Sequence, residues 1–202
     1  MVALFGATHL NAQTISAQLT TIAPGLPITG TVDNGSFIQA WPSGVLQFTD
    51  FEAFCIDPTQ GLAYGESLVY QVQNPLTLDT SNAVARLVGG YLDYLSTATD
   101  PTVTNQNAAA VNWAIWEVTT ESSGSFSLVN GRVRITGTDA SNLNTITLAN
   151  QYLANINNYT PANVTYLFNA DRQDVVTWDP IPEPSTAGLL VLSGLFLFRR
   201  RR

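Results

Sequence analysis

The single cysteine, Cys55, is the residue whose side chain could do the most chemistry in this 202-residue chain. One cysteine can form neither an intrachain disulfide nor a multi-thiolate metal site, because both need at least two thiols. The single histidine, His9, lies within the first ten residues, which argues against a histidine-based catalytic or zinc site. A lone buried cysteine is most often a small hydrophobic side chain. The alternative is a nucleophile that acts on a neighbouring carboxamide.

Three carboxamide side chains are candidates for that partner. Asn112 precedes Trp113, Gln60 follows Cys55 by five residues, and Gln106 lies six residues before Asn112 on the same expected helix. A thiol that attacks a side-chain carboxamide releases ammonia and leaves an internal thioester. Asn112 is one methylene shorter than glutamine, which costs about 1.5 Å of reach. Gln106 would need a different register, since six residues span about 9 Å of helix.

Two segments carry a family resemblance: residues 54–57, which contain Cys55, and residues 111–116, which contain Asn112. The pair resembles the thioester domains of bacterial surface proteins, in which aromatic-Cys-aliphatic-acidic is followed downstream by Thr-Gln-x-Ala-Ile-Trp. The resemblance implies that Cys55 takes the place of the family's thiol. Asn112 stands where the family has glutamine, and Val111 stands where it has threonine. In that family a surface amine opens the thioester, and the protein becomes a covalent adhesin.

Carboxylates give weaker signals. Glu117 and Glu121 lie four residues apart on one expected helix, but a glycoside hydrolase needs carboxylates across a cleft, and a solvated helix end explains the pair better. Asp57 and the segment Asp33-Asn34-Gly35 carry oxygen ligands that calcium could use, yet neither follows the spacing of an EF-hand loop. Turn formation is the commoner role for such residues. We therefore expect no catalytic residue, no metal site and no cofactor.

The C-terminal segment, residues 181–202, combines three features in order. Prolines at 180, 182 and 184 prevent regular helix there, and a twelve-residue apolar run follows from Ala187 to Phe198. The run would span about 18 Å as a helix, shorter than the roughly 30 Å hydrocarbon core of a bilayer, and arginines can reach the interface beyond it. The chain ends on Arg199, Arg200, Arg201 and Arg202. We expect residues 187–198 to be a short membrane helix.

Pro182, Glu183 and Pro184, the apolar helix and the arginine cluster together resemble the PEP-CTERM sorting signal. In that family, exosortase, a membrane-embedded enzyme of Gram-negative bacteria, recognises and cleaves the signal. The resemblance implies export, an inner-membrane-anchored precursor, cleavage near Glu183, and a final place at the cell surface or in the extracellular matrix. The segments around Cys55 and Trp116 are also similar to a recurring layout among exported proteins that carry this signal.

The charge distribution agrees with this division of the chain. Residues 1–180 hold four arginines against fourteen acidic residues, a net charge of −10, whereas residues 181–202 have a net charge of +3. The acidic body has no basic patch to neutralise phosphates, so we expect no nucleic-acid partner. Residues 1–12 contain a short apolar run and Leu10-Asn11-Ala12, which we interpret as the remnant of a secretory signal that starts upstream of Met1.

Residues 13–180 are expected to form one α+β domain that positions these side chains. Turn residues separate short antiparallel strands between residues 28 and 70, with Trp41-Pro42-Ser43-Gly44 as one turn, and further strands are expected at 67–72, 164–168 and 175–178. Asn130-Gly131 predicts a two-residue hairpin between residues 126–128 and 133–135. Helices are expected near 82–95, 105–119 and 141–157, with caps at 79–81 for the first and near Asp139 or Ser141 for the last.

The helix expected over 105–119 has apolar residues on both faces, which predicts burial nearly all round. Gly89-Gly90 weakens the first helix. The third helix is indicated by apolar residues at helical spacing, Leu143, Ile146, Ala149, Leu153 and Ile156. From sequence, the leading hypothesis is a non-enzymatic envelope or matrix protein in adhesion or biofilm structure, with extracellular polysaccharide or a surface molecule as its ligand. The alternatives are a covalent adhesin that uses Cys55 and a secreted polysaccharide hydrolase.

Overall fold

The computed structural model describes residues 13–32, 36–73, 82–121 and 124–179. In these ranges, strands and helices mix as the α+β expectation requires. The elements are β1 (Thr14–Val32), β2 (Ser36–Phe48), β3 (Glu52–Cys55), β4 (Ser67–Gln73), α2 (Ala83–Leu95), α3 (Pro101–Thr120), β5 (Val133–Ile135), α4 (Ala140–Ala154), the 3-10 helix η1 (Ile156–Asn158), β6 (Thr165–Phe168) and β7 (Val175–Thr177).

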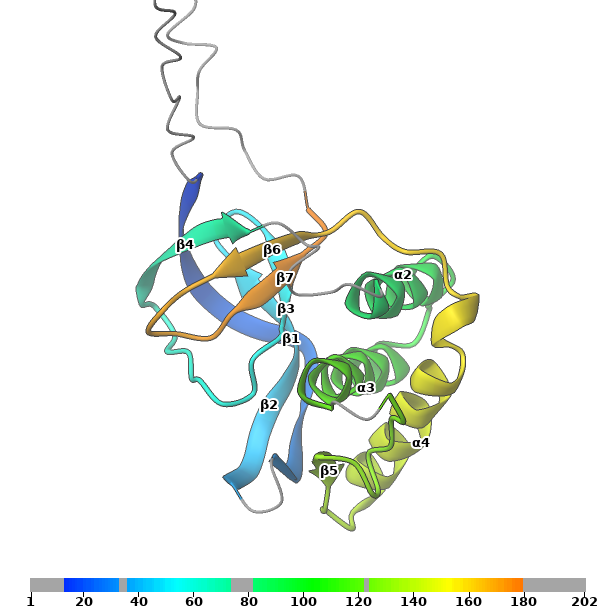
Figure 1. The fold of residues 1–202 in the computed structure, drawn as a ribbon. Coiled ribbons are helices and arrows are strands. Elements are labelled where there is room, and N and C mark those ends of the chain that lie inside the picture. The colour runs from blue at the N-terminus through cyan, green and yellow to red at the C-terminus, as the bar shows by residue number, and fades with distance from the viewer. Residues whose placement is uncertain (1–12, 33–35, 74–81, 122–123, 180–202) are drawn as a thin grey trace, which may run out of the picture.

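The strands form one antiparallel sheet in the order β2-β3-β7-β6-β4-β1-β5. β1 and β2 also pair with each other, so β1, β2, β3, β7, β6 and β4 close into a ring. β1 is long enough to pair with β4 at its start, with β2 along most of its length, and with β5 at its end. The helices α2, α3 and α4 gather on one side of the ring (Figure 1).

Two of the strands are longer than the short strands expected from the sequence: β1 has 19 residues and β2 has 13. The expected turn at residues 41–44 is wrong, because these residues lie inside β2 and pair with β1. The ladder is irregular there, with a register shift between Ile22 and Gly25. Gly25 and Gly44 let the two backbones approach, since a Cβ on Gly25 would lie 2.5 Å from the Ser43 carbonyl oxygen.

Helix α3 is the centre of the fold. Asp100 caps it by accepting a hydrogen bond from the Thr102 N–H at 2.8 Å, and Pro101 takes the first helical position. The helix therefore begins four residues before the expected residue 105. Residues 107–117 are all buried, because α3 packs against β1, β2, α2 and α4. The prediction of a helix buried nearly all round is confirmed.

Helix α2 runs unbroken through Gly89 and Gly90, and both glycines serve packing. A Cβ on Gly90 would lie 2.9 Å from the Tyr159 ring, and a Cβ on Gly89 would overlap the Thr160 carbonyl oxygen. Their cost in helix propensity is offset by this close contact. The residue before the helix is Asn82, with a φ of +55° and no side-chain cap. The caps expected at 79–81 lie outside the described residues.

Helix α4 begins where the sequence predicts and buries most of the expected stripe, since Ala149, Leu153 and Ile156 are buried and Ile146 packs against the core. Asp139 accepts a hydrogen bond from the Asn142 N–H at 3.0 Å, which confirms the cap. The prediction is wrong for Leu143, because 52% of this residue is exposed, whereas the neighbouring Asn142 is buried. The helix turns this polar residue inward because Asn142 Oδ1 accepts a hydrogen bond from the Thr29 N–H of β1 at 2.9 Å. Residues 156–158 continue as a 3-10 turn rather than α-helix.

The expected hairpin about Asn130-Gly131 is wrong. Residues 133–135 do form a strand, β5, but it pairs with β1, and residues 126–128 belong to no strand. The segment is arranged around Glu117 instead: the N–H groups of Ser127 and Val133 both donate to its carboxylate, and the hairpin would have used the first of these N–H groups. A buried carboxylate on α3 therefore outweighs the local turn signal.

Both ends of the chain lie outside the described residues. This applies to the expected signal remnant at 1–12, the sorting motif at 182–184, the apolar run at 187–198 and the arginines at 199–202. Among the helices that are described, none combines the length and apolarity that a membrane span requires.

Candidate functional site

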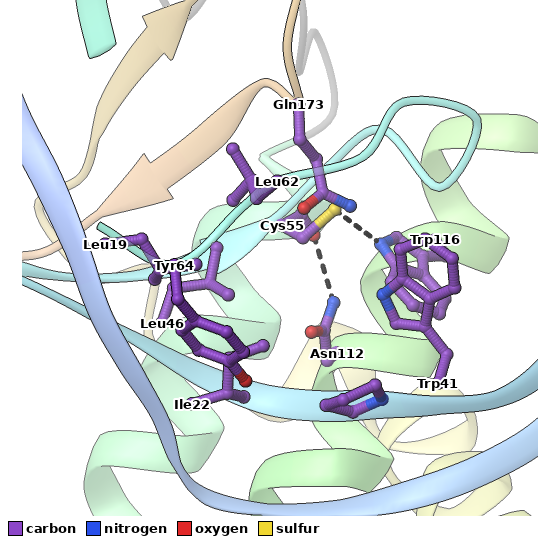
Figure 2. A pocket seen from close by; sticks show the side chains of 11 residues that line it. Leu19, Ile22, Trp41, Leu46, Cys55, Leu62, Tyr64, Asn112, Trp116 and Gln173 are labelled. Carbon is purple, nitrogen blue, oxygen red and sulfur yellow. Dashed lines mark hydrogen bonds between the residues drawn. The ribbon is translucent and has the colours of Figure 1, made fainter. Parts of the chain in front are cut away.

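A pocket of about 150 Å³ lies between the sheet and helix α3 (Figure 2). Residues from six parts of the chain line it: β1, β2, β3, the loop that follows β3, α3, and the connection between β6 and β7. They are Leu19, Ile22, Trp41, Pro42, Leu46, Cys55, Leu62, Tyr64, Asn112, Trp116 and Gln173. The site therefore contains both Cys55 and Asn112, which lie 57 residues apart in the sequence.

The Cys55 thiol is buried in the wall of this pocket, with 2% of the residue exposed. Trp116 Nε1 donates a hydrogen bond to Cys55 Sγ at 3.1 Å, and the thiol donates to the Asp57 carbonyl oxygen at 3.3 Å. Burial raises the pKa of the Cys55 thiol well above its ordinary value, and the nearby carboxylates of Asp57 and Asp174 act in the same direction. The Trp116 hydrogen bond opposes this shift only in part. The thiol is therefore protonated at neutral pH and a weak nucleophile in this state.

Asn112 contacts the backbone of Cys55 rather than its sulfur. Asn112 Nδ2 donates to the Cys55 carbonyl oxygen at 3.0 Å, and Asn112 Oδ1 accepts from the Gly44 N–H at 3.3 Å. Both ends of the carboxamide are thus bound to main-chain groups of β2 and β3. The side chain fastens α3 to the sheet at the pocket, a role that needs its polarity but no reactivity.

Gln173 is a site residue that the sequence did not indicate. It lies in the connection between β6 and β7, where no motif marks it, and only 3% of the residue is exposed. Gln173 Nε2 donates to the Asp57 carbonyl oxygen at 3.1 Å, the same oxygen that accepts from the Cys55 thiol. Figure 2 shows its side chain directed toward Cys55. Within the described parts of the chain, Gln173 Oε1 accepts no hydrogen bond.

The other carboxamides considered from the sequence do not line this pocket. Gln60 is half-buried in the loop after β3, and its Oε1 atom is buried without a partner among the described residues. Gln106 is half-buried on the first half of α3. The Asp57 carboxylate accepts from the Thr59 N–H at 2.8 Å and from its hydroxyl at 2.6 Å, which is turn chemistry.

Aromatic side chains define both the inner and the outer part of the pocket. Trp116 is buried, and its ring packs edge-on against Trp113 at 5.0 Å between centroids. Trp113 is held in turn by a hydrogen bond from its Nε1 to Ser43 Oγ at 2.9 Å. Trp41 and Tyr64 are 38% and 60% exposed, so they lie where the pocket opens to solvent. A rigid aromatic wall and an exposed aromatic rim are features of ligand sites.

The prediction that Glu117 lies at a solvated helix end is wrong, because the residue is completely buried. Its carboxylate accepts from the Ser127 N–H at 2.7 Å and from the Val133 N–H at 3.1 Å. Burial raises the pKa of Glu117, and these hydrogen bonds oppose the shift. Glu117 organises the segment before β5 and does not line the pocket beside Cys55.

A second cavity, of about 240 Å³, is lined by the carboxylates of Asp57 and Asp174 together with Thr119, Thr120 and Tyr166. Asp174 accepts from the Asn169 N–H at 2.8 Å, and burial raises its pKa. No group of three or more histidine, cysteine or acidic side chains within the described ranges is arranged to hold a metal ion. The two carboxylates of this cavity are therefore not joined by a third acidic, histidine or cysteine side chain among the described residues.

The pocket beside Cys55 thus combines an uncharged lining, a protonated thiol and a carboxamide oxygen that is free among the described residues. This arrangement is suited to binding a small neutral group. Comparison of the chain with protein-family models, curated proteins and solved structures finds no match in any of the three.

Proposed function

We propose that this protein is an exported, non-enzymatic component of the cell envelope or extracellular matrix, and that it binds a matrix or surface molecule through the pocket beside Cys55. The observation that carries the binding role is the exposed aromatic rim, Trp41 and Tyr64, over a pocket with buried polar groups. The Trp41 and Tyr64 rings present apolar surface to solvent at the pocket opening, because 38% and 60% of these residues are exposed. Bound apolar surface would recover the free energy that their exposure costs.

Adhesion of intact cells tests this role. Cells that produce the chain would be compared with cells that produce Trp41→Ala, for retention on the extracellular matrix of the same culture. We expect the variant to lose most of the retention, while Leu143→Ala, which removes an exposed apolar side chain of α4 outside the pocket, retains it. Equal retention of all three strains would contradict the proposal.

The export part of the proposal depends on the sequence signal at residues 182–202, with exosortase as the processing partner. Glu183→Ala and deletion of residues 199–202 should each leave unprocessed protein in the inner membrane of a bacterium that has exosortase. Ser185→Ala is the matched control beside the motif and should be processed normally. Normal release of both altered chains, measured by fractionation and immunoblotting, would refute sorting by this signal.

The second candidate function is covalent adhesion through Cys55. What favours it is that the thiol and two carboxamides, those of Asn112 and Gln173, line one pocket. The sulfur would bond to a carboxamide carbon, the C–N bond would break, and the thiol proton would leave with the nitrogen as ammonia. The intact mass would then fall by about 17 Da, the mass of ammonia. Against it stand the raised pKa of Cys55 and the two backbone hydrogen bonds of Asn112.

Within the described chain, the hydrolase alternative could act at the cavity lined by Asp57 and Asp174. A larger pocket also carries two carboxylates, those of Glu66 and Asp171, but Glu66 is paired with Arg172 at 2.7 Å. Glycosidases use one carboxyl group with a raised pKa as general acid, and burial raises the pKa of Asp174. The Asp57 carboxylate is engaged with Thr59, which favours the turn role. Polysaccharide cleavage that is lost in Asp174→Asn but kept in a Gln173 variant would favour the hydrolase over the binding protein.

A further inference from the structure

We propose that the pocket beside Cys55 binds one neutral sugar ring, the terminal residue of an extracellular polysaccharide. This inference rests on the proposed binding function and names the class of ligand. It is argued from the size of the pocket, the absence of charge in its lining, the free acceptor at its wall and the aromatic rim.

The size of the pocket selects a single ring. Its volume is about 150 Å³, and a cavity of roughly that volume in a protein interior holds one six-membered ring such as benzene. The ring of a pyranose would fill this space, and most of its substituents would have to project through the opening at Trp41 and Tyr64. A linear chain of several residues would not fit inside. The pocket therefore suits the end of a chain rather than an internal stretch of it.

The lining selects a neutral ligand. The eleven residues around the pocket include no carboxylate, amine, guanidinium or imidazole. A charged group that entered would lose its hydration without gaining an opposite charge, which costs several kcal/mol for an unpaired ion. Uronic acids, amino sugars with a free amine and phosphorylated groups are excluded on this ground.

The polar groups select a ring that carries hydroxyls. Gln173 Oε1 accepts no hydrogen bond from the described residues, and only 3% of Gln173 is exposed. A hydroxyl could donate to it, whereas a hydrocarbon ring or a phenylalanine side chain would leave it unpaired. Leu19, Ile22 and Leu46 supply the apolar surface for the C–H face of the ring (Figure 2). A pyranose offers both kinds of surface at once.

The rim extends the site beyond the first ring. Figure 2 places Tyr64 on one side of the pocket and Trp41 with Trp116 on the other. Because Trp41 and Tyr64 are partly exposed, each presents a flat apolar face to solvent. The second sugar of the chain would pack against this rim, where aromatic rings gain area at little cost in conformational freedom.

Calorimetric titration of the full 202-residue chain tests the assignment. The probes are methyl glucoside, methyl galactoside, methyl mannoside and N-acetylglucosamine, with glucuronic acid as the charged ring and N-acetylphenylalaninamide as the peptide ring. We expect at least one neutral sugar to bind at least ten times more tightly than glucuronic acid and the peptide ring. Trp41→Ala should weaken it about tenfold and Gln173→Met about fivefold, the scale of one lost hydrogen bond.

Thermal melts of each variant establish that it is folded, and Leu143→Ala should bind as the unchanged chain does. Binding of glucuronic acid or of the peptide ring at equal or greater strength would overturn the sugar assignment. Absence of all binding, or affinities that Trp41→Ala and Gln173→Met leave unchanged, would overturn it as well. The adhesion assay with intact cells is independent, so retention without sugar binding would leave the proposed function in place and remove only this inference.

Discussion

Replacing Asn112 by leucine is the sharpest test of how the site is built. The two side chains have the same number of heavy atoms and branch at the same carbon, so the substitution removes polarity and adds only the volume by which two methyl groups exceed an oxygen and an amino group. It deletes the bond to the Cys55 carbonyl oxygen and the bond from the Gly44 N–H. The Cys55 carbonyl and the Gly44 N–H belong to the main chain, so they remain in the variant and are left without their hydrogen-bond partner.

The expected loss of stability follows from the two main-chain groups that the substitution leaves without a hydrogen-bond partner. Each buried main-chain group that loses its partner costs about 1–3 kcal/mol, so two of them cost about 4 kcal/mol. A buried leucine returns about 2 kcal/mol through removal of apolar surface from water. The free energy of unfolding of Asn112→Leu should therefore fall by about 2 kcal/mol, which lowers the melting temperature by about 4–8 °C in a chain of this length.

Urea unfolding followed by tryptophan fluorescence measures this difference, and a thermal melt followed by circular dichroism checks it. Asn105→Leu is the matched control, because Asn105 lies on the same helix and its Oδ1 accepts a hydrogen bond from the Gly25 N–H at 3.1 Å in a less buried place. It should cost less than Asn112→Leu. A variant at 112 that is as stable as the unchanged chain would refute the fastening role of Asn112.

Three further outcomes are expected. Because it is buried and its pKa is raised, the Cys55 thiol of the folded protein should react with iodoacetamide at pH 8 at least about a hundredfold more slowly than in urea, and the intact mass should show no loss of ammonia; equal rates, or the lower mass, would contradict this. Burial raises the pKa of Glu117, so the folded state binds a proton more tightly than the unfolded state does. The free energy of unfolding should therefore decrease as pH rises from about 4.5 through the folded pKa. Glu117→Gln should flatten this part of the stability curve measured by urea unfolding, and an unchanged slope would disprove the assignment. Gly30→Ala should destabilise the fold by about 3 kcal/mol, because the new Cβ would overlap the Trp113 ring, whereas Gly61→Ala, with its nearest contact at 4.0 Å, should stay within about 0.5 kcal/mol in the same urea assay.

The sequence was most informative where structure depends on local signals. Helix α3 follows from a long run of apolar residues on both faces, and the Asp139 cap of α4 follows from its residue type and position. Strands β4, β6 and β7 follow from short apolar runs between turn residues. In these places the local preference and the tertiary packing agree.

Local signals failed where distant groups decide the structure. Proline and glycine in the first half of the chain suggest turns, yet pairing along the whole of β1 keeps those residues extended. Asn130-Gly131 suggests a hairpin, but the segment is held by Glu117, which accepts hydrogen bonds from the N–H groups of Ser127 and Val133. Gln173 has no local signal at all, because its importance comes only from lying beside Asp57 and Cys55 in the fold.

The polar groups of the pocket differ in how far the fold has already used them. The Cys55 thiol is bound on both sides, by Trp116 and by the Asp57 carbonyl, and both ends of Asn112 are bound to the main chain. Breaking any of these bonds to reach a transition state would expose a buried group without a partner, which adds to the barrier. A ligand can engage Gln173 Oε1 without breaking a hydrogen bond within the described chain. A pocket whose potential reactants are held and whose free atom is an acceptor favours reversible binding over bond formation, and this difference is why we place adhesion through a bound ligand ahead of adhesion through a thioester.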